Sequence, residues 1–140
     1  MTVLRKVELI GGIATGFLAL FGPSSFSLAV FMFSDFTVKE KVLGLLSIFV
    51  TYVGPAILIA IGSYIHAVRQ RATGFLMVLV GCLVLTIIEF IVFVGGFFYA
   101  LGTWSTAVTV LPWASAIVTM IAALLARAAE SRGSGRARPV

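Results

Sequence analysis

The stretch that decides the fold is residues 75–101, FLMVLVGCLVLTIIEFIVFVGGFFYAL, in which Glu89 is the single charged residue. An α-helix needs about 20 apolar residues to cross the hydrocarbon core of a bilayer, because it rises about 1.5 Å per residue. Hydrophobic residues make up 61% of the 140-residue chain and charged residues only 11%. A soluble domain of this size has about a quarter charged residues. We therefore predict that residues 75–101 span a membrane.

Two further stretches have the composition of a membrane span. Residues 42–65 carry no charge, and they are bounded by Lys41 on one side and by a basic turn at 66–71 on the other. Residues 106–126 are apolar up to Arg127. Each is long enough to cross a bilayer as a helix.

The first span is the least regular, because its apolar run covers only residues 9–21. A helix from about residue 3 to residue 22 restores the required length. Its first turns then place three charged side chains at the headgroup level, namely Arg5, Lys6 and Glu8. With this span included, the sequence predicts an all-α fold, a polytopic membrane protein with a four-transmembrane-helix bundle over residues 1–126.

The N-terminal region leaves two alternatives open. Pro23 after Gly22 is a helix stop. The apolar residues 26–33 that follow are either an interfacial or re-entrant segment or the continuation of a kinked first helix, and we favour the separate segment. The basic start and short apolar run also resemble a signal peptide. Glu8 beside that run argues against cleavage of a signal peptide. If cleavage did occur, the mature protein would have three spans.

Lysine and arginine residues set the expected orientation. With four spans, both termini and the turn between the second and third spans lie on one side. That side carries eight basic residues: Arg5, Lys6, Arg69, Arg71, Arg127, Arg132, Arg136 and Arg138. The opposite side carries Lys39 and Lys41. Basic loops stay in the cytoplasm, so we predict a multi-pass protein of the cell membrane with both termini cytoplasmic and a flexible basic tail at 127–140.

Glu89 is the one anomaly inside the predicted spans. An ionised carboxylate at that depth costs roughly 2.5 kcal/mol or more, so we expect it to be protonated or to face a polar partner. In an antiparallel hairpin of the second and third spans, Glu89 lies level with Thr51 and Tyr52. Pro55 cannot donate to the Thr51 carbonyl, and a protonated Glu89 would fill that vacancy. With Thr86 one turn away, the sequence predicts a polar cluster that is a lock between helices, a proton or ion site, or a contact with a partner protein.

Small residues predict close helix packing. Gly12 and Gly16 form a small-xxx-small pair in the first span, and Gly54 with Pro55 interrupts the second. Such residues let helix backbones approach closely in lipid, where packing drives association. We expect these contacts within one chain rather than between two copies.

The composition leaves little material for catalysis. The chain has one His, one Cys and five acidic residues. We expect His66 to be an interfacial side chain and Cys82 to be a small packing residue. A metal site needs several ligands, and no catalytic or phosphate-binding motif is present. We therefore predict no enzymatic activity, no metal and no cofactor. The basic residues lie at span borders without interleaved aromatic residues, which argues against nucleic acid as a partner.

The basic turn His66-Ala-Val-Arg-Gln-Arg71, the glycine-broken helices and the Ala-rich last span after Leu111-Pro112 resemble the small four-span integral membrane proteins of bacteria whose function is unknown. This resemblance is compatible with a cell inner membrane and implies no activity. Small multidrug transporters also have four spans and a membrane glutamate, but theirs lies in the first helix, whereas Glu89 lies in the third.

We therefore expect a non-enzymatic accessory or scaffold subunit, which packs in the lipid bilayer with itself or with a larger membrane complex. The rival function is an oligomeric channel or a proton-coupled small-solute transporter that uses Glu89.

Overall fold

The computed structural model describes residues 1–22, 34–94 and 97–135. Its regular structure consists of helices: α1 (Val3–Phe21), α3 (Val38–Ile48), the π-helical turn η1 (Phe49–Val53), α4 (Gly54–Arg69), α5 (Ala72–Val94) and α6 (Phe97–Gly135). No strand is present in these residues. The all-α fold predicted from the sequence is confirmed.

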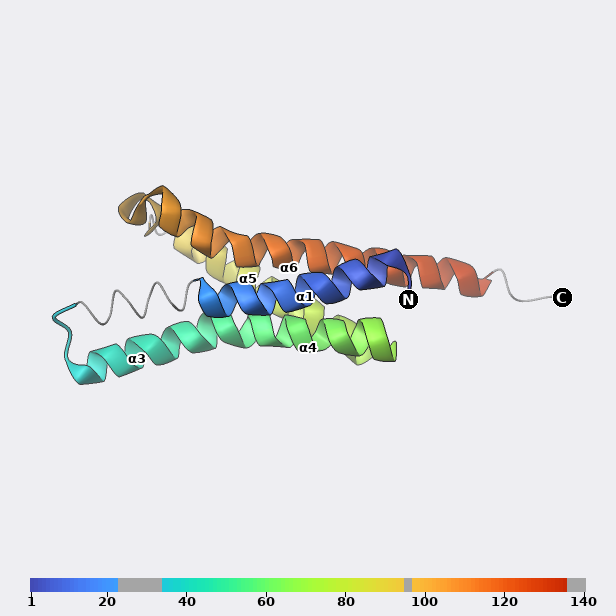
Figure 1. Ribbon diagram of the computed structural model, residues 1–140, viewed down its shortest axis with the longest axis horizontal. Helices are drawn as coiled ribbons and strands as arrows, with labels where there is room; N and C mark the ends of the chain where they lie inside the picture. Colours follow the sequence, from blue (N-terminus) through green and yellow to red (C-terminus); the bar gives the residue numbers. More distant parts are fainter. Residues whose placement is uncertain (23–33, 95–96, 136–140) are drawn as a thin grey trace.

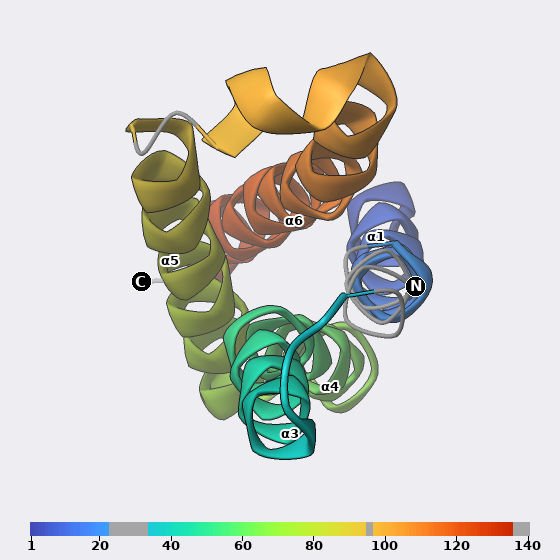
Figure 2. The ribbon, with the colours of Figure 1, turned by 90° about the vertical axis from the view of Figure 1, so that its left-hand side faces the viewer.

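Helices α1, α4, α5 and α6 lie side by side along the length of the molecule (Figure 1). α4 packs against α1 and α5, and α6 packs against the same two helices from the other side. Viewed from one end, the helices form a ring in the order α1, α4, α5, α6 (Figure 2). α3 continues the line of α4 beyond the end of α1 (Figure 1). The start of α1 and the ends of α4 and α6 therefore lie at the same end of the molecule.

Three helical segments are long and apolar enough to cross a membrane: Val38–Arg69, Ala72–Ile91 and Val110–Arg132. They overlap the second, third and fourth predicted spans. α1 is not among them, and its first two turns carry the three charged residues noted above. The described part of the structure thus has three helices that could span a membrane, as expected of a membrane protein. These helices agree with three of the four predicted spans, and the first span is the one that lacks this support.

The boundary between the last two helices lies earlier than the sequence predicts. We expected the third span to reach residue 101 and the fourth to begin at 106. In the structure α5 ends at Val94 and α6 begins at Phe97. α6 then continues through Pro112 without a break. The glycine pair 95–96, where the chain passes from α5 to α6, lies outside the described residues, as does the predicted segment 26–33.

The predicted flexible tail is helical over most of its length. α6 continues to Gly135, so that residues 127–135 extend the last span rather than leaving it. The extension contacts the bundle through Arg127, which lies over the Phe75 ring, and through Glu130, which pairs with Arg5. These contacts order a segment whose composition alone indicated mobility. Residues 136–140 lie outside the described part of the chain.

The helical segment Val38–Arg69 contains a local π-helical turn just before Pro55. Proline has no N–H to donate, and its ring collides with the carbonyl four residues earlier, which belongs to Thr51. The chain widens into the π-helical turn η1 at this point. A wider turn with i→i+5 hydrogen bonds is a known way to accommodate such a defect. The helix therefore continues through the proline, and its defect lies within residues 49–53.

α4 and α5 form an antiparallel hairpin with a very short turn. Gln70 ends α4 in the left-handed conformation, with φ 55°, and its N–H donates to the His66 carbonyl (3.2 Å). Beyond the turn, the two backbones touch at Gly62 and Gly74. A Cβ atom on Gly74 would lie 2.6 Å from the Gly62 carbonyl oxygen. Further along, a Cβ on Gly81 would lie 2.9 Å from the Pro55 carbonyl oxygen.

Candidate functional site

The hairpin register places Glu89 at the level of η1, near the predicted partners. Its side chain is buried in the bundle, with 8% of the residue exposed. The Thr51 hydroxyl, however, donates to the Ser47 carbonyl of its own helix (2.5 Å). The Thr86 hydroxyl donates to the Cys82 carbonyl one turn earlier (2.8 Å). Because each hydroxyl has one proton, neither threonine donates to Glu89.

Tyr52 and Trp113 complete the polar region around Glu89. Tyr52 is partly buried against the core and lies within electrostatic range of Glu89. Trp113, from α6, donates through Nε1 to the Thr86 hydroxyl oxygen (3.2 Å). The sequence indicated Tyr52 as a neighbour of Glu89 but not Trp113. The predicted cluster is therefore divided: Glu89 and Tyr52 lie within electrostatic range of each other, Thr86 accepts from Trp113, and Thr51 is bonded locally.

A second polar cluster lies at the opposite end of the bundle, where the sequence predicted only headgroup contacts. Glu8 of α1 is completely buried, and His66 of α4 is 4% exposed. His66 Nδ1 lies 2.8 Å from Glu8 Oε1. Glu8 Oε2 is buried and has no hydrogen-bond partner in the described part of the chain. A buried carboxylate oxygen without a partner is unusual, because most buried polar atoms are paired.

Arg5 joins three helices next to this pair. The residue is 5% exposed, and its Nε donates to Glu130 Oε1 of α6 (2.9 Å), with a second contact from Nη2 to the same oxygen. Its Nη1 donates to the Ala67 carbonyl of α4 (3.2 Å). The Glu130 side chain is half exposed. We name the four residues Arg5, Glu8, His66 and Glu130 the inner cluster.

Aromatic contacts surround the inner cluster on the side of α5. The Phe75 ring centroid lies 5.6 Å from that of His66. The guanidinium of Arg127, a residue of α6, lies 4.5 Å from the same Phe75 ring centroid. Phe75 is 7% exposed and belongs to the core. His66 therefore lies between an acidic side chain and an aromatic ring. It is a buried side chain and not the interfacial one that the sequence predicted.

The sequence contains a signal for the inner cluster that composition and depth do not reveal. The buried residues of α1 recur every three or four positions along one face: Arg5, Glu8, Gly12, Thr15 and Ala19. This spacing defines one stripe of a helix. Two charged residues therefore occupy the buried face on which the small residues also lie, whereas Lys6 is exposed.

The glycine pair of α1 packs against α4 of the same chain. A Cβ on Gly12 would overlap the Ser63 side chain, and a Cβ on Gly16 would lie 3.5 Å from Ala60 Cβ. Pro55 is buried in the hairpin described above. No atom of another described helix lies within 4 Å of the position that a Cβ on Gly54 would take, so Gly54 makes no close contact with another helix.

Hydroxyl groups inside the bundle are bonded within the chain. Thr15 donates to the Gly11 carbonyl (2.8 Å), and Ser115 of α6 donates to the same carbonyl across the helix interface (3.1 Å). Ser63 and Thr119 donate to carbonyls in their own helices (both 2.8 Å). Hydroxyls that bond to the preceding turn are typical of apolar helix interiors. They stabilise packing, and among the described residues they form no continuous chain between the inner cluster and Glu89.

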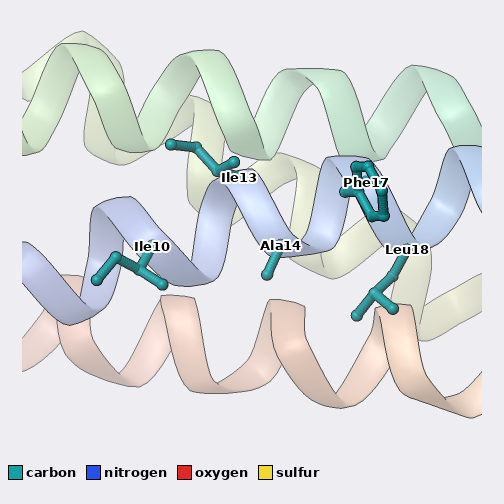
Figure 3. Close-up of a pocket in the computed structure, with 5 residues that line it drawn as sticks. All are labelled: Ile10, Ile13, Ala14, Phe17 and Leu18. Atoms are coloured by element: carbon teal, nitrogen blue, oxygen red, sulfur yellow. The ribbon is translucent and has the colours of Figure 1, made fainter.

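The outward face of α1 carries an apolar groove of about 470 Å³ (Figure 3). Small Ala14 lies at its centre, with larger side chains on either side; the lining residues are Ile10, Ile13, Ala14, Phe17 and Leu18. Ile10 and Phe17 are 67% and 60% exposed. Such a surface is typical of a site that contacts lipid or another apolar helix.

The remaining reactive side chain is Cys82, which is buried and donates to the Ala116 carbonyl (3.2 Å). Among the described residues, no three His, Cys, Asp or Glu side chains gather to hold a metal ion. The chemistry available at the two polar regions is therefore proton binding and charge pairing.

Comparison with known proteins gave no relative for this chain. No family model, no curated protein and no solved structure matches it.

Proposed function

We propose that α1 is a fourth membrane span, so that the protein is a four-helix membrane bundle with both termini in the cytoplasm. α1 has 19 residues and is about 28 Å long, close to the thickness of the hydrocarbon core. Arg5 pairs with Glu130 and Glu8 pairs with His66, so that both side chains have partners inside the bundle rather than facing lipid. This pairing reduces the cost of charges at the end of the span. The excess of basic residues at this end of the molecule favours its cytoplasmic location.

Within the membrane, we propose that the protein is a non-enzymatic accessory or scaffold subunit, which packs with a second copy or with a larger membrane complex. The groove around Ala14 is the observation that carries this proposal. It presents a notch between large apolar side chains on a face that no helix of the described chain covers. Helices associate in lipid through such complementary packing. The locally bonded hydroxyls in the interior favour a packing role over transport.

A second candidate is an oligomeric channel or a proton-coupled small-solute transporter that uses Glu89. The observation that favours it is the burial of this carboxyl in α5, where its two predicted threonine partners donate elsewhere. Acidic residues inside a membrane commonly mark proton or ion pathways. No second acid lies beside it in the described residues of the neighbouring spans.

Reconstitution of the purified chain in liposomes separates the two functions. For a scaffold, wild type and the Glu89→Gln variant both give no ion or proton flux above that of protein-free liposomes. Wild type also migrates in mild detergent as an oligomer or with a fixed partner. Wild-type flux that is lost in folded Glu89→Gln would instead establish the transporter. A silent protein that is strictly monomeric and without a partner would contradict the scaffold.

A further inference from the structure

We propose that Glu8 and His66 form a proton-binding site, which holds one proton between α1 and α4 in the folded protein. The two side chains are in contact through Oε1 and Nδ1 at 2.8 Å. Glu8 is completely buried, and its Oε2 has no partner in the described part of the chain. This inference goes beyond the scaffold function and does not depend on it, because it concerns how the protein itself is held together.

The charges around the pair leave Glu8 without a cation of its own apart from His66. Arg5, on the same helix, makes its hydrogen bonds to Glu130 and to the Ala67 carbonyl, and none to Glu8. Glu130 of α6 is the carboxylate that balances Arg5. Arg127, also on α6, is exposed and lies over Phe75. From α5, the Phe75 ring packs against His66, and the titratable residues of this helix, Cys82 and Glu89, lie about two turns or more further along it.

With His66 neutral and Glu8 ionised, the inner cluster therefore carries one uncompensated negative charge in a closed site. An ionised carboxylate that is buried with one oxygen unbonded is strongly unfavourable. One proton removes this charge in either of two positions. On His66 it gives an imidazolium–carboxylate pair, and on Glu8 Oε2 it gives a neutral acid whose Oε1 accepts from Nδ1–H. In both cases the folded pair binds one proton.

Proton binding ties the folded state to pH with a definite sign. In the unfolded chain an ordinary glutamate has lost its proton at neutral pH, and an ordinary histidine has lost most of its own. The folded pair keeps its proton, so folding takes one up from solution. Stability is then greatest where the proton is bound and is lost as pH rises and the pair releases it. Linkage of a single proton changes the folding equilibrium at most about tenfold per pH unit.

Thermal unfolding of the full chain in detergent, followed from neutral to alkaline pH, tests this site. We expect the melting temperature of wild type to fall as pH rises. In Glu8→Gln, a neutral amide takes the place of the protonated carboxyl, so its melting temperature is expected to vary much less with pH. Asp35→Asn is the matched control, because it removes an exposed acid that lies outside the inner cluster. It keeps the wild-type slope.

Infrared difference spectra of wild type between neutral and alkaline pH supply a second measurement, which does not require a stable variant. A carboxylic-acid or imidazolium band that disappears at alkaline pH supports the site. A wild-type melting temperature and spectrum that do not change with pH overturn the proposal. It is also overturned if folded Glu8→Gln keeps the full pH slope of wild type.

Discussion

Gly74→Ala is expected to destabilise the protein by about 3 kcal/mol or more, at or above the upper end of the usual cost of overpacking. Gly74 sits where α5 begins to cross α4. An added Cβ would lie 2.6 Å from the Gly62 carbonyl oxygen and 2.9 Å from the Ile65 carbonyl carbon, and it would also overlap the His66 nitrogen. All three are backbone atoms, so no side-chain rotation relieves the overlap. The α4–α5 hairpin must therefore open, and His66 then becomes less buried.

Gly54→Ala is the matched control for this substitution. Gly54 lies on α4, next to the other end of the same hairpin, but no atom of another described helix lies within 4 Å of an added Cβ. Alanine favours a helix over glycine by about 1 kcal/mol, and the contact of its methyl group with the following Pro55 ring opposes this gain. Thermal unfolding in detergent should therefore show Gly54→Ala close to the wild-type melting temperature, and Gly74→Ala far below it. Equal stability of the two variants would mean that α4 and α5 do not approach each other closely at Gly74.

His66→Ala is expected to cost about 3–5 kcal/mol, because it leaves the fully buried Glu8 carboxyl without its only hydrogen-bond partner in the described structure. The loss also removes the ring packed against Phe75. An exposed basic residue of the same helix, Arg69, is the control, and Arg69→Ala should change stability by no more than about 0.5 kcal/mol.

A double-mutant cycle isolates the interaction between the two side chains. In the Glu8→Gln background, His66→Ala should cost clearly less than it does in wild type, because no ionisable group is left stranded. The free energies of unfolding come from chemical denaturation in mixed detergent micelles. If His66→Ala costs the same in both backgrounds, His66 and Glu8 do not interact, and the inner cluster is not a unit.

The apolar runs and the hairpin were predictable from the sequence because they depend on length and composition. A stretch as long and apolar as residues 75–101 is typical of a membrane span. A short turn at 70–71 forces antiparallel neighbours, so the level of Glu89 follows from counting residues. The helix boundary after Val94 and the helical course of 127–135 were not predictable in this way. The latter depends on Arg127 and Glu130 contacting helices far away in the sequence.

The inner cluster was missed because the charges of α1 were judged by depth rather than by helix face. Arg5 and Glu8 sit at a predicted border, where long side chains normally reach the headgroups. Their spacing with Gly12 and Thr15 placed them on the buried stripe instead. His66 was assigned to a turn, whereas α4 continues one further turn to Arg69 and carries the ring inward. Only the packing of α1 beside α4 brings the two residues together.

The hydroxyl partners predicted for Glu89 illustrate a different limit. Counting residues along the helices was a sound guide to which residues lie level with Glu89. A threonine inside a helix, however, can donate to a backbone carbonyl of its own preceding turn. Thr51 and Thr86 both take that local bond. Pairing across helices therefore cannot be derived from depth alone.

The most direct test of the central proposal, four spans with both termini in the cytoplasm, is labelling of single added cysteines in intact cells with a membrane-impermeant thiol reagent. The native Cys82 is 1% exposed and provides a silent background. The added cysteines are Thr2→Cys, Lys39→Cys and Ala129→Cys, all at exposed positions. With four spans, Lys39→Cys is labelled from outside, whereas Thr2→Cys and Ala129→Cys are labelled only after permeabilisation. Labelling of Thr2→Cys from outside, with Ala129→Cys protected, would mean that α1 does not cross the membrane and would contradict the four-span bundle.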